Sequence, residues 1–249
     1  MTNKIEPADA KFDPVEEAKR LLRTTRAAAL ATATSPDGSP FASLVNVATA
    51  PDASPLLLLS RLAAHTHHLE ADPRLSLLFY SALNRPNGGD PLTHPRLTIV
   101  GTATRIDDAA TRAAVRARFL ARHPKSSLYA DFADFSFFHV AIDTAHLNGG
   151  FGRAAHLSPE RLLTSLDGAD LLIVNEEKLI ADITTADPTL PARLAAIQCG
   201  EGEAWRLAGF DPEGLDLADE ERLIRVVFAE RVTNEDDLRQ QIAVLLEKS

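Results

Sequence analysis

Short apolar segments separated by turn-forming residues recur through roughly the first 150 residues of this chain. Most alternate apolar and polar side chains, which is typical of strands with one face in a core. Proline, glycine, aspartate and serine gather between them. The segments expected to form strands are Ala27–Thr34, Phe41–Ala48, Leu56–Arg61, Leu75–Tyr80, Arg96–Ile106 and Phe135–Ile142. This regular spacing, with few helices between strands, predicts an α+β protein built on a β-barrel rather than an alternating parallel α/β fold.

Helices are expected where capping residues precede an apolar stripe. Asp13 can cap a helix that has Pro14 at its first position and Glu16 completing a capping box. A second helix should begin after Asp107 or Asp108 and run to about Arg122. A short helix is predicted over Thr66–Glu70.

The pattern changes after residue 152, and we place a domain boundary near residue 158. Residues 1–158 would form the barrel, and residues 159–249 a smaller α/β domain. Helices are predicted over Pro159–Leu166, Ala169–Ile183 and Leu190–Ile197, then short strands over Ala204–Leu207, Leu215–Leu217 and Leu223–Phe228. A last amphipathic helix should follow Thr233–Asp236.

Composition narrows the class of protein. The formal net charge is −9 and the isoelectric point is about 5.4, which argues against general nucleic-acid binding. Cys199 is the only cysteine, so neither an intramolecular disulfide nor a cysteine-based zinc site can form. No signal peptide is visible, and no run approaches the ~20 apolar residues of a membrane span. We therefore expect a cytoplasmic protein with no nucleic-acid or membrane partner.

The most informative stretch for function is Leu56–Tyr80, where a polar cluster separates two apolar runs. Ser60, Arg61, His65 and Thr66 could hold a phosphate at the start of a short helix. The alternative is an exposed helix start with an ordinary cap. His65 and His68 have a spacing that could bind a metal, but no further ligand is placed to complete the site, so no metal is expected.

Three other groups of residues could carry chemistry. Arg96 and Thr98 share one side of a predicted strand and could contact a planar ring, although on their own a polar outer face of the barrel is the preferred explanation. Arg122, Ser126 and Ser127 could receive an anionic substrate, or could belong to an ordinary helix end with dipole-compensating cations. His156 could ligate a haem iron, although a lone histidine is more often structural.

Several motifs in order resemble the pyridoxamine 5′-phosphate oxidase-like family. They are FASLVNVATAPDASPLLLLSRLAAHTHHLEADPRLSLLFY, HPRLTIVGTATRI, the helix ending RFLARHP, DFADFSFFHV and GGFGRA. Together they cover most of residues 14–158. AGFDPEGLDL, residues 208–217, is similar to the small domain that follows the barrel in HugZ-type haem-utilisation proteins.

This resemblance implies a split β-barrel that forms a homodimer with FMN in a cleft between subunits. Ser60, Arg61, His65 and Thr66 would lie beside the FMN phosphate. Ser43, Leu44 and Val45 would line the flavin ring through backbone groups, and Arg96, Leu97 and Thr98 would approach from the partner subunit.

Departures from the family pattern limit the reaction. Ala63-Ala64-His65 stands where true oxidases carry Ser-Arg-Lys, Leu97 replaces an amide, and Phe119 replaces a tyrosine. Authentic pyridoxal phosphate synthesis is therefore not expected. No histidine follows His156, and Ile173–Lys178 lacks the His-Met-Asn-x-Asp-His motif of the haem-degrading relatives.

Three hypotheses follow. The first is an FMN-binding, flavin-dependent oxidoreductase, with no general acid or base identifiable. The second is a haem-binding or haem-degrading protein of the HugZ type, with His156 as the candidate iron ligand. The third is a non-enzymatic module that has lost its cofactor.

Overall fold

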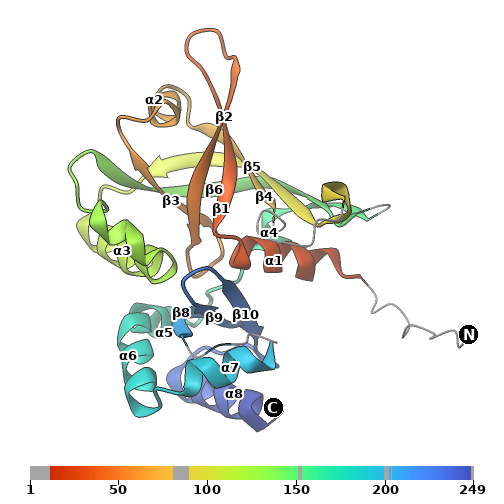
Figure 1. The fold of residues 1–249 in the computed structure, drawn as a ribbon, viewed down its shortest axis with the longest axis vertical. Helices are drawn as coiled ribbons and strands as arrows, with labels where there is room; N and C mark the ends of the chain where they lie inside the picture. Colours follow the sequence, from red (N-terminus) through yellow and green to blue (C-terminus); the bar gives the residue numbers. More distant parts are fainter. Residues whose placement is uncertain (1–11, 81–89, 151–152, 199–201, 203, 248–249) are drawn as a thin grey trace, which may run out of the picture.

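A computed structural model describes residues 12–80, 90–150, 153–198, 202 and 204–247. The chain folds into an antiparallel barrel with a smaller sheet-and-helix unit packed below it (Figure 1). The described helices of the barrel half are α1 (Pro14–Thr24), α2 (Ala64–Ala71), η2 (Pro91–Thr93), α3 (Ala109–Arg122), η3 (Pro124–Leu128) and α4 (Pro159–Leu162). Its strands are β1 (Ala27–Ala33), β2 (Pro40–Thr49), β3 (Pro55–Ser60), β4 (Arg74–Tyr80), β5 (Arg96–Arg105), β6 (Phe135–Asn148) and β7 (Ala154–Leu157).

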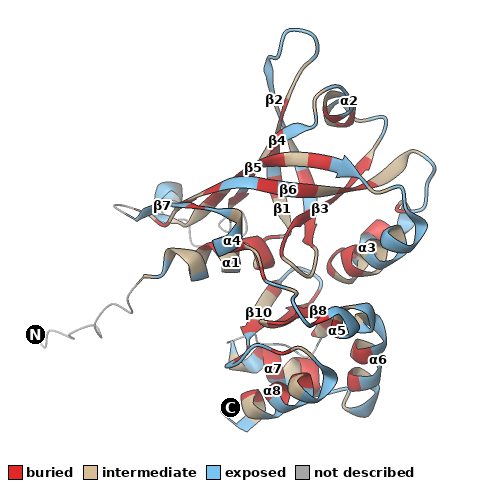
Figure 2. Cartoon of the chain, turned by 180° about the vertical axis from the view of Figure 1, so that it is seen from behind, coloured by how far each residue is buried: buried red, intermediate tan, exposed pale blue. Residues whose placement is uncertain are grey.

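The strands run in the order β3-β2-β1-β4-β5-β6-β7, and β3 also pairs with β6. That second pairing closes a six-stranded barrel and leaves β7 as an appended edge strand. Side chains alternate between the barrel interior and the outside, as the burial pattern along the strands shows (Figure 2). The interior is filled by aliphatic residues such as Leu30, Leu77 and Ile99, all fully buried. The predicted α+β class with a split barrel is confirmed.

The smaller unit, called the lower unit below, contains β8 (Arg206–Asp211), β9 (Gly214–Ala218) and β10 (Leu223–Val227). Its sheet is covered by α5 (Asp170–Val174), α6 (Glu176–Ala186), α7 (Leu190–Ile197) and α8 (Glu235–Glu247). These elements share a separate apolar core that includes Trp205, Phe210 and Leu238. Leu162 of α4 packs instead in the barrel core. The boundary near residue 158 stays a prediction.

Several element predictions differ from the structure, and strand β6 runs to Asn148 instead of ending at Ile142. The helix expected over Ala169–Ile183 is interrupted at Asn175, whose backbone leaves helical geometry and whose amide nitrogen bonds the carbonyl oxygen of Leu171. The helix expected over Pro159–Leu166 ends at Leu162. Strand β7 was not predicted, since it has only four residues. Phe151 and Gly152 of the GGFGRA motif lie outside the described residues.

Charged side chains join the two units across a buried interface. Arg23 of α1 and Arg118 and Arg122 of α3 meet acidic residues of the lower unit. The contacts include Arg23 Nη1 to Asp211 Oδ2 at 3.1 Å and a short hydrogen bond from Arg122 to Asp216. Arg118 likewise donates to Glu176 and to the carbonyl oxygen of Phe210.

Arg225 of β10 completes this network. It donates to Asp211 at 2.6 Å and to Asp216 at 3.0 Å. Burial alone would raise the pKa of Asp216, but the charges of Arg122 and Arg225 outweigh it and lower the pKa below its ordinary value. The carboxylate is therefore held ionised, and it links α3 of the barrel half to β9 and β10.

None of the helices among the described residues combines the length and hydropathy needed to cross a lipid bilayer.

Candidate functional site

The predicted phosphate cluster lies where β3 ends and α2 begins. Ser60 Oγ donates to the Asp134 carboxylate at 2.7 Å, and Thr66 Oγ1 donates to the carbonyl oxygen of Ser60 at 2.7 Å. Both hydroxyl protons are thus used inside the protein, and a carboxylate stands beside them. An incoming phosphate would have to displace these contacts.

Arg61 and His65 are the members of the cluster that remain available to an anion. The Arg61 side chain is exposed and has no carboxylate partner among the described residues, while its backbone amide donates to the carbonyl oxygen of Asp134. His65 is half-buried, and burial, followed by the neighbouring His68, lowers its pKa. It therefore stays neutral at physiological pH.

Two histidines of α2 are fixed by hydroxyls on the β1–β2 hairpin. His65 Nδ1 lies 3.0 Å from Ser43 Oγ, and His68 Nδ1 lies 3.0 Å from Thr32 Oγ1. The Ser43 side chain lies on the inward side of the sheet, like that of its partner Leu30, and faces α2. Within the part of the chain that the structure describes, no three His, Cys, Asp or Glu side chains gather as a metal site.

A second group lies on the outer face of the barrel. Strand register places six residues in one row across six strands, and all six point away from the core. In order from β2 to β7 they are Leu44, Ala29, Leu78, Thr98, His146 and His156. We call this set the outer row. Leu44 and Leu78 keep 68% and 39% of their surface exposed, so the row offers an apolar surface that ends in two imidazoles.

The imidazoles of His146 and His156 are in contact. Their ring centroids are 4.5 Å apart, and the planes are tilted by 56°. His156 is exposed, whereas Nδ1 of His146 is buried and has no hydrogen-bond partner among the described residues. The pair is therefore a tilted ring contact with one accessible imidazole, suited to binding a group that lies over the sheet.

The other strand residues that were predicted to contact the flavin lie on both the outer and the inner face of the barrel. Arg96 lies beside the outer row, opposite Asn148, with its guanidinium bonded to the carbonyl oxygens of Leu92 and His94. Leu97 is fully buried and Val45 nearly so, because both point into the barrel. These two could contribute to a bound ligand only through backbone groups.

The three residues that were predicted to contact a substrate lie neither at the phosphate cluster nor at the outer row. Arg122 is 1% exposed and is bound to Asp216 in the domain interface. Ser126 is buried, with its hydroxyl 2.8 Å from the Tyr129 hydroxyl, and Ser127 donates to the carbonyl oxygen of Pro124. A ligand could reach Arg122 only if the two units separated.

Sequence reasoning missed Leu78 and His146. Leu78 lies at an outward position of an apolar strand, where a single exposed leucine is common, and His146 lies beyond the predicted end of its strand at Ile142. Strand register identifies both residues, because each lies directly opposite Thr98, which was predicted from the sequence.

Comparisons with known proteins agree with this architecture. Residues 14–149 match the model of the family described as pyridoxamine 5′-phosphate oxidase. A protein of unknown function from Agrobacterium tumefaciens, whose crystal structure is known, has a sequence 32% identical to this one. Its structure gives a TM-score of 0.84, with 98% of this chain and 100% of that chain covered. A heme binding protein from Mycobacterium smegmatis is 26% identical, with a TM-score of 0.56 over 96% of this chain and 98% of the other.

A curated relative matches the barrel half. HOZ, a non-canonical chloroplastic heme oxygenase from Arabidopsis thaliana, is 36% identical over 132 residues. The matched region is 53% of this chain but only 39% of that relative, so this chain spans well under half the relative's length.

Proposed function

This chain belongs to the pyridoxamine 5′-phosphate oxidase family, and we propose that it binds haem on the outer face of its barrel, as a haem-binding or haem-degrading member. The observation that carries the proposal is the contact between the tilted His146 and His156 rings at the end of the outer row. A haem needs an apolar surface for its ring and an axial ligand for its iron, and imidazole is a common axial ligand.

Two histidines of the outer row fit such a ligand. His156 has an accessible ring and would bind the iron, with His146 holding that ring in position from beneath. Bound haem would supply iron redox chemistry, while the protein would supply orientation and exclusion of water. The heme oxygenase and heme binding relatives support this assignment.

The proposal is tested by titrating the purified protein with haemin and recording absorption spectra. We expect a Soret band near ~410 nm, at least about 100-fold weaker haemin binding in His156→Ala, and a shifted band with about 10-fold weaker binding in His146→Ala. His67→Ala, an exposed histidine on α2, is the matched control and should leave the spectrum unchanged. Equal haemin affinity in the wild type and His156→Ala would refute the assignment.

FMN remains a second candidate, supported by the exposed Arg61, which has no carboxylate partner among the described residues. The same preparation distinguishes the two ligands. Absorption near ~450 nm, together with thermal stabilisation by micromolar FMN that is lost in Arg61→Ala, would favour the flavin. A protein that gains stability from neither ligand would instead be a module without a cofactor.

We further propose that two copies of the chain pack through this outer face, so that the haem lies in a cleft between subunits. Leu44, Leu78 and Val100 expose 68%, 39% and 43% of their surface on one side of the sheet, an apolar area that a second copy could cover.

Light scattering tests the dimer. Leu78→Glu would place a carboxylate in the buried interface and should weaken the dimer about 100-fold, which is about 2.7 kcal/mol. Leu171→Glu alters a leucine that is 79% exposed on α5 and should leave the mass unchanged. A wild-type monomer at micromolar concentration would contradict the shared cleft.

A further inference from the structure

The last turn of α3 is held between the barrel and the lower unit, on the side of the barrel that faces that unit (Figure 1). Ala121 packs against an apolar cluster of the lower unit's sheet that includes Ala208 and Leu223. His123 ends the helix and is only 5% exposed. Its imidazole belongs neither to the outer row nor to the ionic network around Asp216.

Guanidinium groups bind the carbonyl oxygens that end this helix. Arg206 of β8 donates to the carbonyl oxygen of Ala121 at 2.8 Å, and Arg26 donates to that of Arg122 at 2.9 Å. Arg26 also donates to the carbonyl oxygen of Glu220 in the lower unit at 2.6 Å. Cations are favourable at a helix C-terminus, where the last carbonyls have no partner within the helix. The end of α3 is therefore a point at which the lower unit is held against the barrel half.

The His123 ring is kept neutral at this point. Its Nε2 lies 2.9 Å from the carbonyl oxygen of Val47, which can only accept, so the neutral ring carries its hydrogen on Nε2. The ring also lies against Phe119, with centroids 4.8 Å apart. A second proton, on Nδ1, would place a full charge in a buried position. Burial lowers the pKa of His123 from the ordinary 6.5 to about 4, and the bond to Val47 offsets this only in part.

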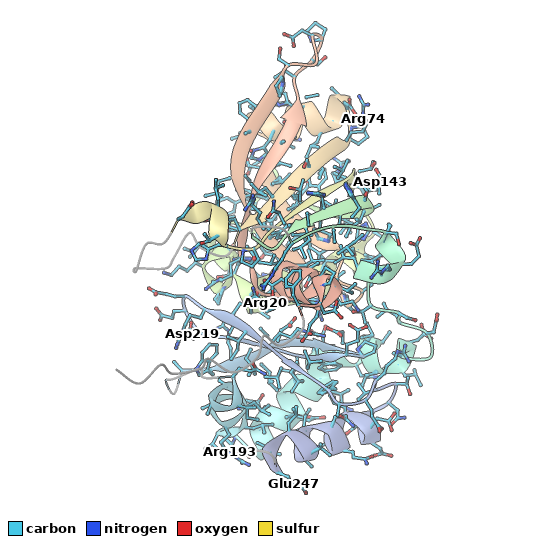
Figure 3. The ribbon with its side chains drawn as sticks, turned by 90° about the vertical axis from the view of Figure 1, so that its right-hand side faces the viewer. Arg20, Arg74, Asp143, Arg193, Asp219 and Glu247 are labelled. Carbon is cyan, nitrogen blue, oxygen red and sulfur yellow. The ribbon has the colours of Figure 1, made fainter. Side chains whose placement is uncertain are left out.

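The charges that act most strongly on the ring are all positive. Arg26 precedes β1, Arg122 lies in α3 and Arg206 lies in β8, and each of them lowers the pKa of the imidazole further. The acidic Asp219 and Glu221 of the same junction act on Arg26. Figure 3 shows Asp219 at the edge of the lower unit that is nearest the barrel. A protonated ring would therefore add a fourth cation to this junction.

The carboxylates of the neighbouring buried network titrate in a lower range. Burial alone would raise the pKa of Asp211, but the charges of Arg23 and Arg225 outweigh it, as those of Arg122 and Arg225 do at Asp216. Both carboxylates stay ionised at pH 5. Their charge therefore does not change between pH 7 and pH 5 and cannot mask that of the imidazole.

We propose that His123 makes the end of α3 an acid-sensitive latch, whose opening exposes the imidazole and loosens the lower unit. In the open form the ring lies in water with its ordinary pKa, so the open form binds a proton that the closed form excludes. The closed form is most stable above pH 6.5 and loses that stability as the pH falls from 6.5 to about 4. The opening equilibrium constant should rise about 20-fold between pH 7 and pH 5. The latch does not depend on the proposed haem face.

Hydrogen exchange of the full chain, corrected for the intrinsic pH dependence of amide exchange, measures the opening. The amide of His123 bonds the carbonyl oxygen of Phe119, and the amide of Ser126 bonds that of His123, so both exchange when the latch opens. We expect residues 119–126 to lose about 20-fold in protection between pH 7 and pH 5, and to be at least about 10-fold less protected than β4 at pH 5. Equal protection of the two segments would mean that only global unfolding exposes the imidazole, and would overturn the latch.

Two glutamine variants identify the titrating group. His123→Gln keeps a donor for the carbonyl oxygen of Val47 but cannot titrate, so its loss of protection should shrink to below about 3-fold. His67→Gln, at an exposed position of α2, is the matched control and should behave like the wild type. The proposal fails if wild-type protection does not fall, or if His123→Gln loses as much as the wild type.

Nuclear magnetic resonance of the imidazole nitrogens in the wild type adds a test that needs no variant. We expect the His123 ring to stay neutral at pH 5 in the folded protein, because its position excludes a second proton. A ring that is already protonated at that pH would overturn the proposal.

Discussion

Asp216→Asn should lower the free energy of unfolding by about 3–5 kcal/mol, because it removes one partner from a buried ionic network. Asp216 is fully buried and accepts from Arg122 and Arg225, with Arg118 Nη2 4.0 Å away. Asparagine keeps the shape but not the charge. Three guanidiniums would then be left buried with less compensation, and Arg122 and Arg118 already have nitrogens with no hydrogen-bond partner in the described part of the chain.

Urea unfolding measures the effect, and the single tryptophan reports on the relevant unit. Trp205 is 6% exposed in the core of the lower unit, with the Arg222 guanidinium over its ring. Asp187→Asn is the matched control, since Asp187 pairs with Arg193 at the surface and should contribute about 0–1 kcal/mol. A loss for Asp216→Asn no larger than for Asp187→Asn would mean that the network does not stabilise the interface.

The barrel was predictable because each of its strands has an alternating or continuous apolar pattern bounded by turn residues. Strand β4, for example, alternates buried and outward residues from Leu75 onward. The pairing of β3 with β6 that closes the barrel joins segments about 80 residues apart, as for Leu57 and Phe138, and no local pattern specifies it. Sequence therefore indicated the strands, and the family resemblance supplied the closure.

The site was predicted less completely, since it depends on contacts between distant segments. Thr98 and His156 were separate candidates from the sequence, and register joins them through His146. Arg122 shows the opposite outcome. At the end of a helix it had the pattern of an anion contact, but its partner is Asp216, 94 residues later in the chain. A local reading could not have distinguished a ligand from a carboxylate of the second unit.

Gly101→Ala should destabilise the barrel by about 3 kcal/mol, because a side chain at this position has no room. A Cβ atom on Gly101 would lie 2.2 Å from the carbonyl oxygen of Ala141, and backbone cannot yield as a flexible side chain does. The register of β5 against β6 shifts between Val100 and Gly101, so this glycine permits the close approach at an irregularity of the sheet. To admit a methyl group, β6 would have to move.

That movement connects the stability of the barrel to the proposed haem site. His146 lies on β6 beyond the irregularity, and Thr98 lies opposite it on β5. Gly101→Ala should therefore weaken haemin binding as well as lower the urea midpoint, whereas Thr104→Ala, at an exposed position of the same strand, should change neither. If Gly101→Ala matched Thr104→Ala in urea, β6 would accommodate the methyl group. If it unfolded earlier but bound haemin like the wild type, the outer row would be independent of the β5–β6 irregularity.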